Sequence, residues 1–354
     1  MARIIPIISP KQGTGKTFVC LHLAHALASK GHGVCLLATG WNLEDEGAWF
    51  DKHLPGDLKE VLYGRSRLED VIGRDGGLQV IADSDGLKSV ADGRTEDLPL
   101  VAEMLSGTEG CDYLIVDAPS GVSQRAMAFC LTVEEAVLVL TLDSQCLTAA
   151  FDLLRAMAAN GFKGVVKTVF NQVRNMSMAR RAFGKFRDST RRYLDLDLEM
   201  LGIIHYDPKA REASRDKRPL PNAKASRAFR DIQEMAMAID QEVPTDRQAL
   251  PMEDFWKGFF RHMRCLLPQP VQVARKIAAA SVSEARPADS AKAGRDDRAL
   301  ERIAAALEQL LREVQVIRQN LEKGAGARLD GEPAQFHEPL KLDWQDYVNN
   351  RGRR

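Results

Sequence analysis

The residues best suited to chemistry lie near the start of the chain, in the segment IIPIISPKQGTGKTF (residues 4–18). An apolar run leads into a loop that contains Gly13 and Gly15, and Lys16 and Thr17 then open a helical pattern. Glycines let the backbone N–H groups of such a loop point at oxyanions, and the following helix adds its partial positive charge. The lysine can reach terminal phosphates, and the threonine hydroxyl can ligate Mg²⁺. The spacing therefore predicts a site for a nucleoside triphosphate.

Continuous apolar runs predict the strands that would hold this loop in place. Such runs are typical of strands that helices cover on both faces. The expected strands are Arg3–Ile8, Gly33–Leu37, Leu78–Ala82, Tyr113–Asp117, Ala136–Leu142, Val165–Asn171 and Leu201–His205. Helical patterns such as Thr17–Lys30 lie between them. This alternation predicts an α/β fold, a doubly wound, mostly parallel sheet in a P-loop nucleotide-binding domain over residues 1–243.

The pattern changes after residue 243 and predicts an α-helical C-terminal extension. Residues 244–267 contain an amphipathic helix whose apolar side chains, within 252–267, share one face. Residues 268–298 are rich in Ala, Ser, Pro and charge, which predicts a flexible linker. Apolar residues in 299–323 follow a heptad spacing, which predicts a coiled-coil seam or a docking helix. Residues 324–354 form a polar tail to which we assign no fold.

Composition narrows the classes of partner and compartment. The chain of 354 residues is 45% hydrophobic and 28% charged, which is ordinary for a soluble globular protein. Lys+Arg and Asp+Glu number 49 each, so attraction to nucleic acid or lipid must come from local patches. The six cysteines form no CxxC pair, which favours reduced thiols in the cytoplasm. We expect neither a signal peptide nor a membrane-spanning run.

The residues KQGTGKT (11–17) resemble the deviant Walker motif KGGxGKT of the MinD/ParA family of dimeric ATPases. Three further segments resemble the family in the same order: CDYLIVDAPSGVS (111–123), VVKTVFNQV (165–173) and LGIIHYDPKAREA (201–213). The resemblance covers about residues 3–240. It implies that the cofactors are ATP and Mg²⁺ and that the protein forms a nucleotide-dependent homodimer.

The resemblance also implies roles for individual residues. The loop residues expected to surround the phosphates are Gln12, Gly13, Thr14, Gly15, Lys16, Thr17 and Phe18. Thr17 and Asp117 would hold the metal, and Pro119–Gly121 would sense the γ-phosphate. Lys11 and Lys16 would be the catalytic lysines, with Lys11 reaching the nucleotide of the other protomer.

Two further implications concern the base and the cellular process. Asn171 would read the adenine, and Asp207 would lie near the base or ribose. Residues 58–72 and 221–239 resemble the flagellar-number regulators of the family, the FlhG/FleN branch. The resemblance thus implies a switch that regulates flagellar number or placement, or a similar spatial process, through a flagellar or polar regulatory protein. The alternatives are a ParA-like DNA-binding segregation ATPase and a nucleotide-binding pseudo-ATPase scaffold.

Several positions depart from the family pattern. The resemblance implies an Asp-x-Asp after the second strand, whose second Asp orients the attacking water, but Ala38 and Gly40 occupy those places. Pro10 replaces the first glycine of the strict motif G-x-x-x-x-G-K-[ST], and Gln12 replaces a family glycine. Phosphoryl transfer depends on positioning, so we expect slow hydrolysis or a switch with impaired turnover. The acidic residues 44–46 could substitute, although a solvated charge run is the favoured interpretation.

Two surfaces leave alternatives open. Basic side chains cluster in residues 174–192 and 209–230, where they could bind DNA without sequence preference, but we favour solvated helix faces. The helix within 252–267 could lie in a membrane interface, or it could pack on its own domain or on a partner, and the pattern supports these two alternatives equally. The expected location is cytoplasmic, with peripheral contact at the inner face of the cell membrane under the first alternative.

Overall fold

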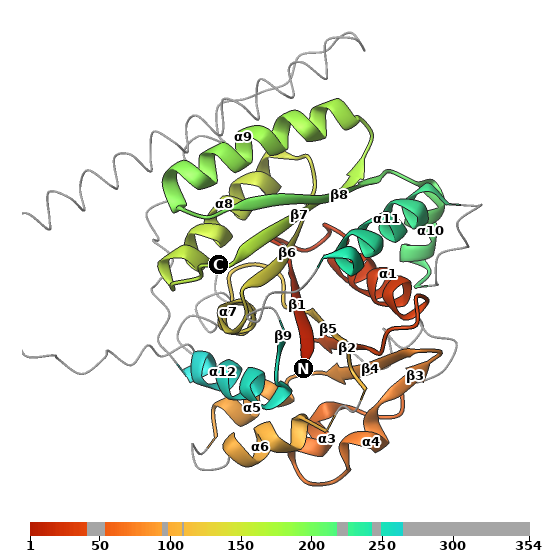
Figure 1. The fold of residues 1–354 in the computed structure, drawn as a ribbon, viewed down its shortest axis with the longest axis vertical. Coiled ribbons are helices and arrows are strands. Elements are labelled where there is room, and N and C mark those ends of the chain that lie inside the picture. The colour runs from red at the N-terminus through yellow and green to blue at the C-terminus, as the bar shows by residue number, and fades with distance from the viewer. Residues whose placement is uncertain (41–53, 94–97, 108–109, 218–225, 243–248, 265–354) are drawn as a thin grey trace, which may run out of the picture.

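The computed structural model describes residues 1–40, 54–93, 98–107, 110–217, 226–242 and 249–264. These residues form a nine-stranded sheet with helices packed on both faces (Figure 1). Eight strands lie in the order β3-β4-β2-β5-β1-β6-β7-β8, and β9 pairs with β1. The predicted α/β fold with a mostly parallel sheet is confirmed.

The seven predicted strands are all present, and two short strands join them. The strands are β1 (Ala2–Ile8), β2 (Val34–Thr39), β3 (Gly73–Asp75), β4 (Leu78–Asp83), β5 (Tyr113–Asp117), β6 (Glu135–Leu140), β7 (Val165–Val173), β8 (Leu198–His205) and β9 (Ala249–Leu250). Their pairings are parallel except those of β3 with β4 and of β9 with β1. Both exceptions are too short to carry a periodic sequence pattern.

Helices connect the strands. They are α1 (Lys16–Ala28), α3 (Leu58–Leu62), α4 (Leu68–Val71), α5 (Gly86–Ala91), α6 (Leu98–Leu105), α7 (Gln124–Thr132), α8 (Ser144–Ala159), α9 (Met176–Leu194), α10 (Pro208–Arg215), α11 (Arg227–Gln241) and α12 (Met252–Arg264). The side chains of Ser123, Asp143, Asn175, Asp207 and Ser226 cap the N-termini of α7 through α11. Such caps fix where each helix begins.

The central strands are buried on both faces, as their continuous apolar runs predict. In β1, Ile4 and Ile8 pack in a core with α7 and α8, whereas Ile5 and Ile7 pack in a second core with α1 and α11. Helix α1 is buried on nearly all sides because α11 covers the surface that the sheet leaves free.

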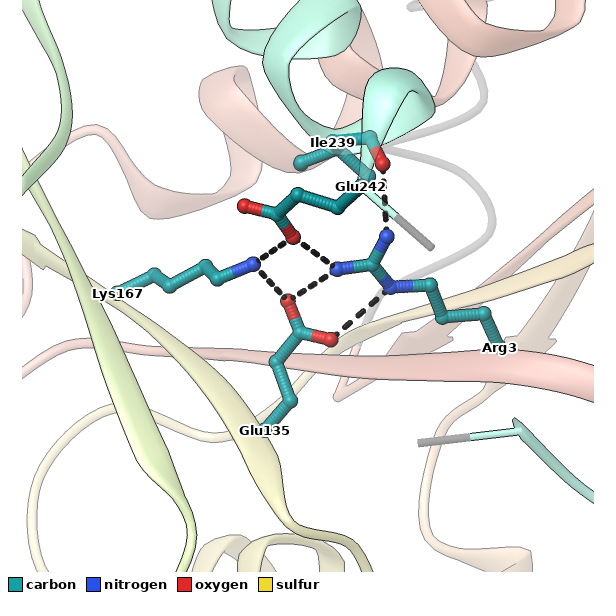
Figure 2. Close-up of polar contacts among 5 residues, drawn as sticks. All are labelled: Arg3, Glu135, Lys167, Ile239 and Glu242. Carbon is teal, nitrogen blue, oxygen red and sulfur yellow. Dashed lines mark hydrogen bonds and ion pairs between the residues drawn. The ribbon is translucent and has the colours of Figure 1, made fainter. Parts of the chain in front are cut away.

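A group of buried charges lies at the amino-terminal edge of the sheet (Figure 2). Glu135 accepts hydrogen bonds from Arg3 Nε at 3.0 Å and Arg3 Nη2 at 2.9 Å, and pairs with Lys167 at 2.9 Å. Glu242, just after α11, pairs with both cations, and Arg3 also donates to the Ile239 carbonyl oxygen at 2.7 Å. This cluster fastens the end of α11 to β1, β6 and β7.

Candidate functional site

The phosphate loop has the backbone conformation that its glycines predict. Gly13 and Gly15 have φ values of +82° and +83°, in the left-handed region that favours glycine. A Cβ on Gly15 would collide with the amide nitrogen of Asn171, whereas a Cβ on Gly13 would meet nothing within 4 Å. Helix α1 begins at Lys16, directly after this turn. The loop therefore ends at a helix N-terminus, the arrangement that binds phosphates.

Asp117, at the carboxyl end of β5, lies between three side chains of α1. Lys16 Nζ forms an ion pair with it, Thr17 Oγ1 donates a hydrogen bond at 2.8 Å, and Cys20 Sγ lies at 3.3 Å. Asp117 is buried, as are Lys16 and Cys20. Burial, reinforced by the charge of Asp117, raises the pKa of the Cys20 thiol, so the thiol stays protonated and can donate. The predicted phosphate lysine and both predicted metal ligands thus lie together.

The entry to the loop is tied to the segment after β5. Gly121 N–H donates to the Ser9 carbonyl oxygen at 2.7 Å, and the hydroxyls of Ser9 and Ser120 lie 3.0 Å apart. Lys11 Nζ pairs with Asp143 at the start of α8, at 2.8 Å. The pKa of Asp143 is lower than usual. Partial burial alone would raise it, but the hydrogen bonds from Lys11 and Thr141 outweigh that effect. Lys11 therefore has an anionic partner within its own chain.

Asn171 contacts the phosphate loop itself. Its side-chain amide donates to the Thr14 carbonyl oxygen at 2.9 Å and lies against Gly15. The sequence predicts that Asn171 ends its strand, but β7 continues to Val173 through a register shift after Phe170. Within this irregularity Gln172 adopts φ +59° and its side chain points to the Gly13 carbonyl oxygen at 3.4 Å. No periodic pattern in the sequence could have predicted the place of Gln172, because that place depends on the irregularity in β7.

Asp207 has a clear structural role at the junction of α10 and α11. One carboxylate oxygen accepts from Lys209 N–H at 2.9 Å, and the other accepts from the Ser226 hydroxyl at 2.7 Å and Arg227 N–H at 2.8 Å. Burial works to raise the pKa of Asp207, but the hydrogen bonds from Ser226 and backbone amides lower it. The carboxylate thus joins two helix starts, and its expected contact with base or ribose stays a prediction.

Ala38 and Gly40, which occupy the places of the expected Asp-x-Asp, lie at the end of β2. Ala38 is the register neighbour of Asp117, so Gly40 lies two residues beyond, at the same carboxyl edge of the sheet. A Cβ on Gly40 would come within 3.9 Å of Arg125 Nη2, from the first turn of α7. Neither Ala38 nor Gly40 offers an acceptor side chain, as the sequence indicates. The acidic residues 44–46 lie outside the described residues.

Helix α12 packs on its own domain, which is the second of the two alternatives for 252–267. Phe255, Trp256, Phe259, Phe260 and Met263 are buried against α5, α6 and α7. The ring of Phe259 stacks on Phe129 of α7 at 4.4 Å between centroids. Since the apolar face is covered, it is not available to a membrane in this arrangement. No helix among the described residues is long and apolar enough to cross a membrane.

The described parts of the two basic segments lie mainly on α9, α10 and α11. On α9, the exposed basic side chains are Arg180, Arg181, Lys185, Arg187, Arg191 and Arg192. The opposite side of α9 packs into the core through Phe183 and Phe186, and α10 likewise exposes Lys209, Arg211 and Arg215. These are amphipathic surface helices, the interpretation we favour. Residues 218–225 of the second segment, and the expected linker, heptad helix and tail in 268–354, lie outside the described residues.

Comparison with known proteins identifies the domain. The family described as the CobQ/CobB/MinD/ParA nucleotide binding domain matches residues 5–220, more than half of the chain. The antiactivator FleN of Pseudomonas aeruginosa is 27% identical over 236 residues, covering 65% of this chain and 84% of FleN. The septum site-determining protein MinD of Bacillus subtilis is 27% identical over 243 residues, with 66% and 88% covered. The flagellum site-determining protein YlxH of Helicobacter pylori is 23% identical over 267 residues, with 74% and 89% covered.

Solved structures agree with this assignment. MinD of Pyrococcus horikoshii, complexed with Mg-ADP, has a TM-score of 0.54 and 25% identity, and the match covers 68% of this chain and 97% of that protein. MinD of Aquifex aeolicus has a TM-score of 0.54 at 22% identity, with 70% and 100% covered, and supports the fold. With the phosphate loop ending at α1 and Asp117 beside Lys16 and Thr17, the chain belongs to the MinD/ParA nucleotide-binding family.

Proposed function

We propose that this protein is an ATP-binding switch of the MinD type that regulates flagellar number or placement, or a similar spatial process. The observation that carries the proposal is the convergence of Lys16 and Thr17 on Asp117 at the end of the phosphate loop. A buried lysine, a hydroxyl and a carboxylate beside a helix N-terminus form a set suited to a nucleoside triphosphate with its metal.

Each loop residue has a definable part in nucleotide binding. The backbone amides from Gly13 to Thr17 would donate to phosphate oxygens, helped by the positive end of α1. Lys16 would move from Asp117 to the terminal phosphates. Asn171 would keep the loop in shape through the Thr14 carbonyl while its neighbourhood receives the base. Phe18, on the first turn of α1, is buried in the hydrophobic core, so it supports the site by packing.

The residues present fit Mg²⁺. Thr17 Oγ1 and Asp117 Oδ2 are hard oxygen donors only 2.8 Å apart, next to the loop that would hold the phosphates. When bound, Mg²⁺ would supply positive charge that neutralises the phosphate oxygens. Thr17 would act as a ligand, and Asp117 would orient the shell around the ion.

The same edge of the sheet is suited to a nucleotide-dependent homodimer. In that assembly Lys11 would exchange Asp143 for the nucleotide of the other protomer. Breaking the pair with Asp143 would cost little, because both side chains are partly exposed and such pairs contribute about 0–1 kcal/mol. ATP would then stabilise the dimer over the monomer, and the dimer would engage a regulatory partner.

The flagellar assignment rests on relatives. Both FleN and YlxH bear names that concern activation or flagellar placement, and FleN aligns over 84% of its length. We infer a cytoplasmic regulator of this branch. Because α12 buries its aromatic face, peripheral membrane contact through this helix would require α12 to separate from α7. Turnover of ATP is expected to be slow, since residue 40 carries no side chain.

Calorimetry with ATP tests the binding proposal. Lys16→Ala should abolish measurable binding. Lys30→Ala alters a lysine just past the far end of α1, where it pairs with Asp240, and should leave affinity within about twofold. Asp117→Asn should release Lys16 from its ion pair, so ATP should bind without Mg²⁺ at least as tightly as to the parent, while the gain from added Mg²⁺ disappears. Equal heats for the parent and Lys16→Ala would overturn the proposal.

The cellular role needs a separate measurement. In cells lacking the chromosomal copy, flagella per cell counted by electron microscopy should return to normal with the parent gene and not with Lys16→Ala. Normal counts in the deletion strain itself would remove the flagellar role but leave the nucleotide site untouched.

A further inference from the structure

A buried thiol touches the carboxylate of the proposed metal site. Cys20 Sγ lies 3.3 Å from Asp117 Oδ1, and Thr17 Oγ1 donates to the other carboxylate oxygen at 2.8 Å. Cys20 and Asp117 are 0% and 1% exposed, so water does not compete for this contact. A carboxylate oxygen that pairs with a lysine accepts hydrogen bonds, so the thiol is the donor. The contact is therefore a hydrogen bond to a charged group.

Helix α1 fixes the place of the thiol. Residues four apart lie on the same face of a helix, so Cys20 stands one turn beyond Lys16, with Thr17 beside it. All three side chains reach Asp117, the last residue of β5, from that face. Cys20 also lies in the hydrophobic core, where close packing leaves its short side chain little room to move. The donor thus belongs to the rigid part of the domain.

The two donors on Asp117 Oδ1 differ in what a nucleotide would do to them. Lys16 pairs with Oδ1 in this structure, but in the proposed function it moves to the terminal phosphates. A lysine can make such a move because its stem is long and flexible. The Cys20 thiol cannot follow, because it is buried one turn beyond the loop. Oδ1 therefore keeps the thiol as a donor when the lysine leaves.

We propose that Cys20 is a positioning residue of the magnesium site: its thiol holds Asp117 Oδ1, so that Oδ2 faces Thr17 and the shell of the metal after Lys16 has moved to the phosphates. The inference rests on the proposed nucleotide site. In this role Cys20 acts through Asp117 and not on the phosphates or the ion. Hydrogen bonds to a carboxylate from behind limit its rotation, and such outer partners strengthen metal binding.

The arrangement predicts an effect on one equilibrium in particular. A thiol is a weak donor, but its acceptor here is charged, which strengthens the bond. Loss of the donor should therefore reduce the gain in ATP affinity that Mg²⁺ brings by about fivefold, the scale of one hydrogen bond. A thiol that served packing alone would change ATP affinity by the same factor with and without the metal.

Calorimetry with ATP on the full-length protein, with Mg²⁺ and again with a chelator, tests the proposal. Cys20→Ala removes volume and Cys20→Val adds it, but neither side chain can donate. Both should reduce the Mg²⁺-dependent gain about fivefold and keep the metal-free affinity within about twofold of the parent. Cys20→Ser keeps a donor and should recover part of the gain.

The matched control is Cys130→Ala. Cys130 on α7 is also 0% exposed and lies in the hydrophobic core. Cys130→Ala and Cys20→Ala each remove one buried sulfur, so both should lower the unfolding temperature. Only Cys20→Ala should reduce the gain from Mg²⁺.

Infrared spectroscopy of the thiol gives a readout that does not depend on affinity. A hydrogen bond lowers the frequency of the S–H stretching vibration, and few other protein groups absorb in that region. The difference spectrum between the parent and Cys20→Ser isolates the Cys20 band. This band should lie at the low-frequency end of the thiol bands and stay there after ATP and Mg²⁺ are added, because the contact with Asp117 persists.

The outcomes are distinct. A full gain from Mg²⁺ in Cys20→Ala and Cys20→Val overturns the inference, as does an equal loss of affinity with and without the metal. Two further results would also contradict it: a gain in Cys20→Ser as low as in Cys20→Ala, and a Cys20 band that moves to the frequency of an unbonded thiol when ATP and Mg²⁺ bind. All four leave the proposed switch intact. A parent that binds no ATP removes the proposed function, and this inference with it.

Discussion

His22 on α1 carries a pH dependence that its burial imposes. Its ring is buried, with Nδ1 2.8 Å from the Phe18 carbonyl oxygen. Burial lowers its pKa from 6.5 to about 4. Between these values the unfolded chain binds a proton that the folded chain does not, so stability falls as pH falls through this window.

We therefore predict that His22→Gln flattens the acid limb of the stability curve. The parent should lose up to about 3 kcal/mol of unfolding free energy through this residue between pH 6.5 and pH 4. Urea unfolding at several pH values measures it. His25→Gln, one turn away and more exposed, should change the slope much less. Parallel curves for the parent and His22→Gln would contradict the prediction.

Thr168 is a polar residue within the buried strand β7. It is fully buried, and its hydroxyl has no hydrogen-bond partner among the described residues. Thr168→Val should stabilise the fold by about 1 kcal/mol, because it removes an unpaired buried hydroxyl at constant shape. Thr190→Val is the control and should destabilise, since the Thr190 hydroxyl donates to the Phe186 carbonyl oxygen at 2.8 Å. Thermal unfolding of both variants decides the sign.

The site residues differ in how far sequence could predict them. Gly13, Gly15, Lys16, Thr17 and Asp117 were predictable because each stands at a fixed offset from a strand end or helix start. Arg125 was not, since its proximity to Gly40 depends on how α7 meets β2 in space. Nor does a motif show that Asp207 bonds to Ser226 and Arg227 across α10 and α11.

Among the elements, α12 shows most clearly what a hydrophobic pattern in the sequence cannot predict. Its amphipathic sequence is equally suited to a lipid surface and to a protein surface, because both bury an apolar stripe. The surface that receives it is made of α5, α6 and α7, which are distant in sequence. Strand β9 brings α12 to them by pairing two residues with β1, too few for periodicity to reveal.

The docking of α12 predicts a measurable contribution to stability. Phe259→Ala should cost about 3–5 kcal/mol, because a fully buried ring stacked on Phe129 leaves a cavity. Lys257→Ala on the same helix breaks only an exposed pair with Glu253 and should cost less than about 0.5 kcal/mol. Chemical unfolding of both variants compares the buried face of α12 with its exposed face. A Phe259→Ala loss as small as that of Lys257→Ala would show that α12 is not docked in solution.

At the scale of the whole molecule, the two edges of the sheet have opposite characters. The carboxyl edge carries the phosphate loop, with side chains that a ligand can recruit. The amino edge carries the cluster of Arg3, Glu135, Lys167 and Glu242, whose charges are satisfied within the chain (Figure 2). The parallel order of the strands, read correctly from the apolar runs, is what separates them.

The cluster predicts a graded response to neutralisation. Glu135→Gln should destabilise by about 3 kcal/mol or more, because it leaves Arg3 and Lys167 buried with one carboxylate fewer. Glu242→Gln should cost less, since that side chain is 40% exposed and water can solvate the cations from its side. Unfolding free energies at neutral pH test the order. A larger loss for Glu242→Gln would mean that the contact with α11, not burial, dominates.

The end of α12 is held by contacts with two other parts of the domain. Gln124, the first residue of α7, donates to the Met263 carbonyl oxygen, and Arg264 donates to the Ala91 carbonyl oxygen at 3.0 Å. The last residues of α12 therefore lie against the start of α7, the helix directly after the Asp117 segment. A displacement of that segment would pull on Gln124 first and would reach α12 through this one hydrogen bond.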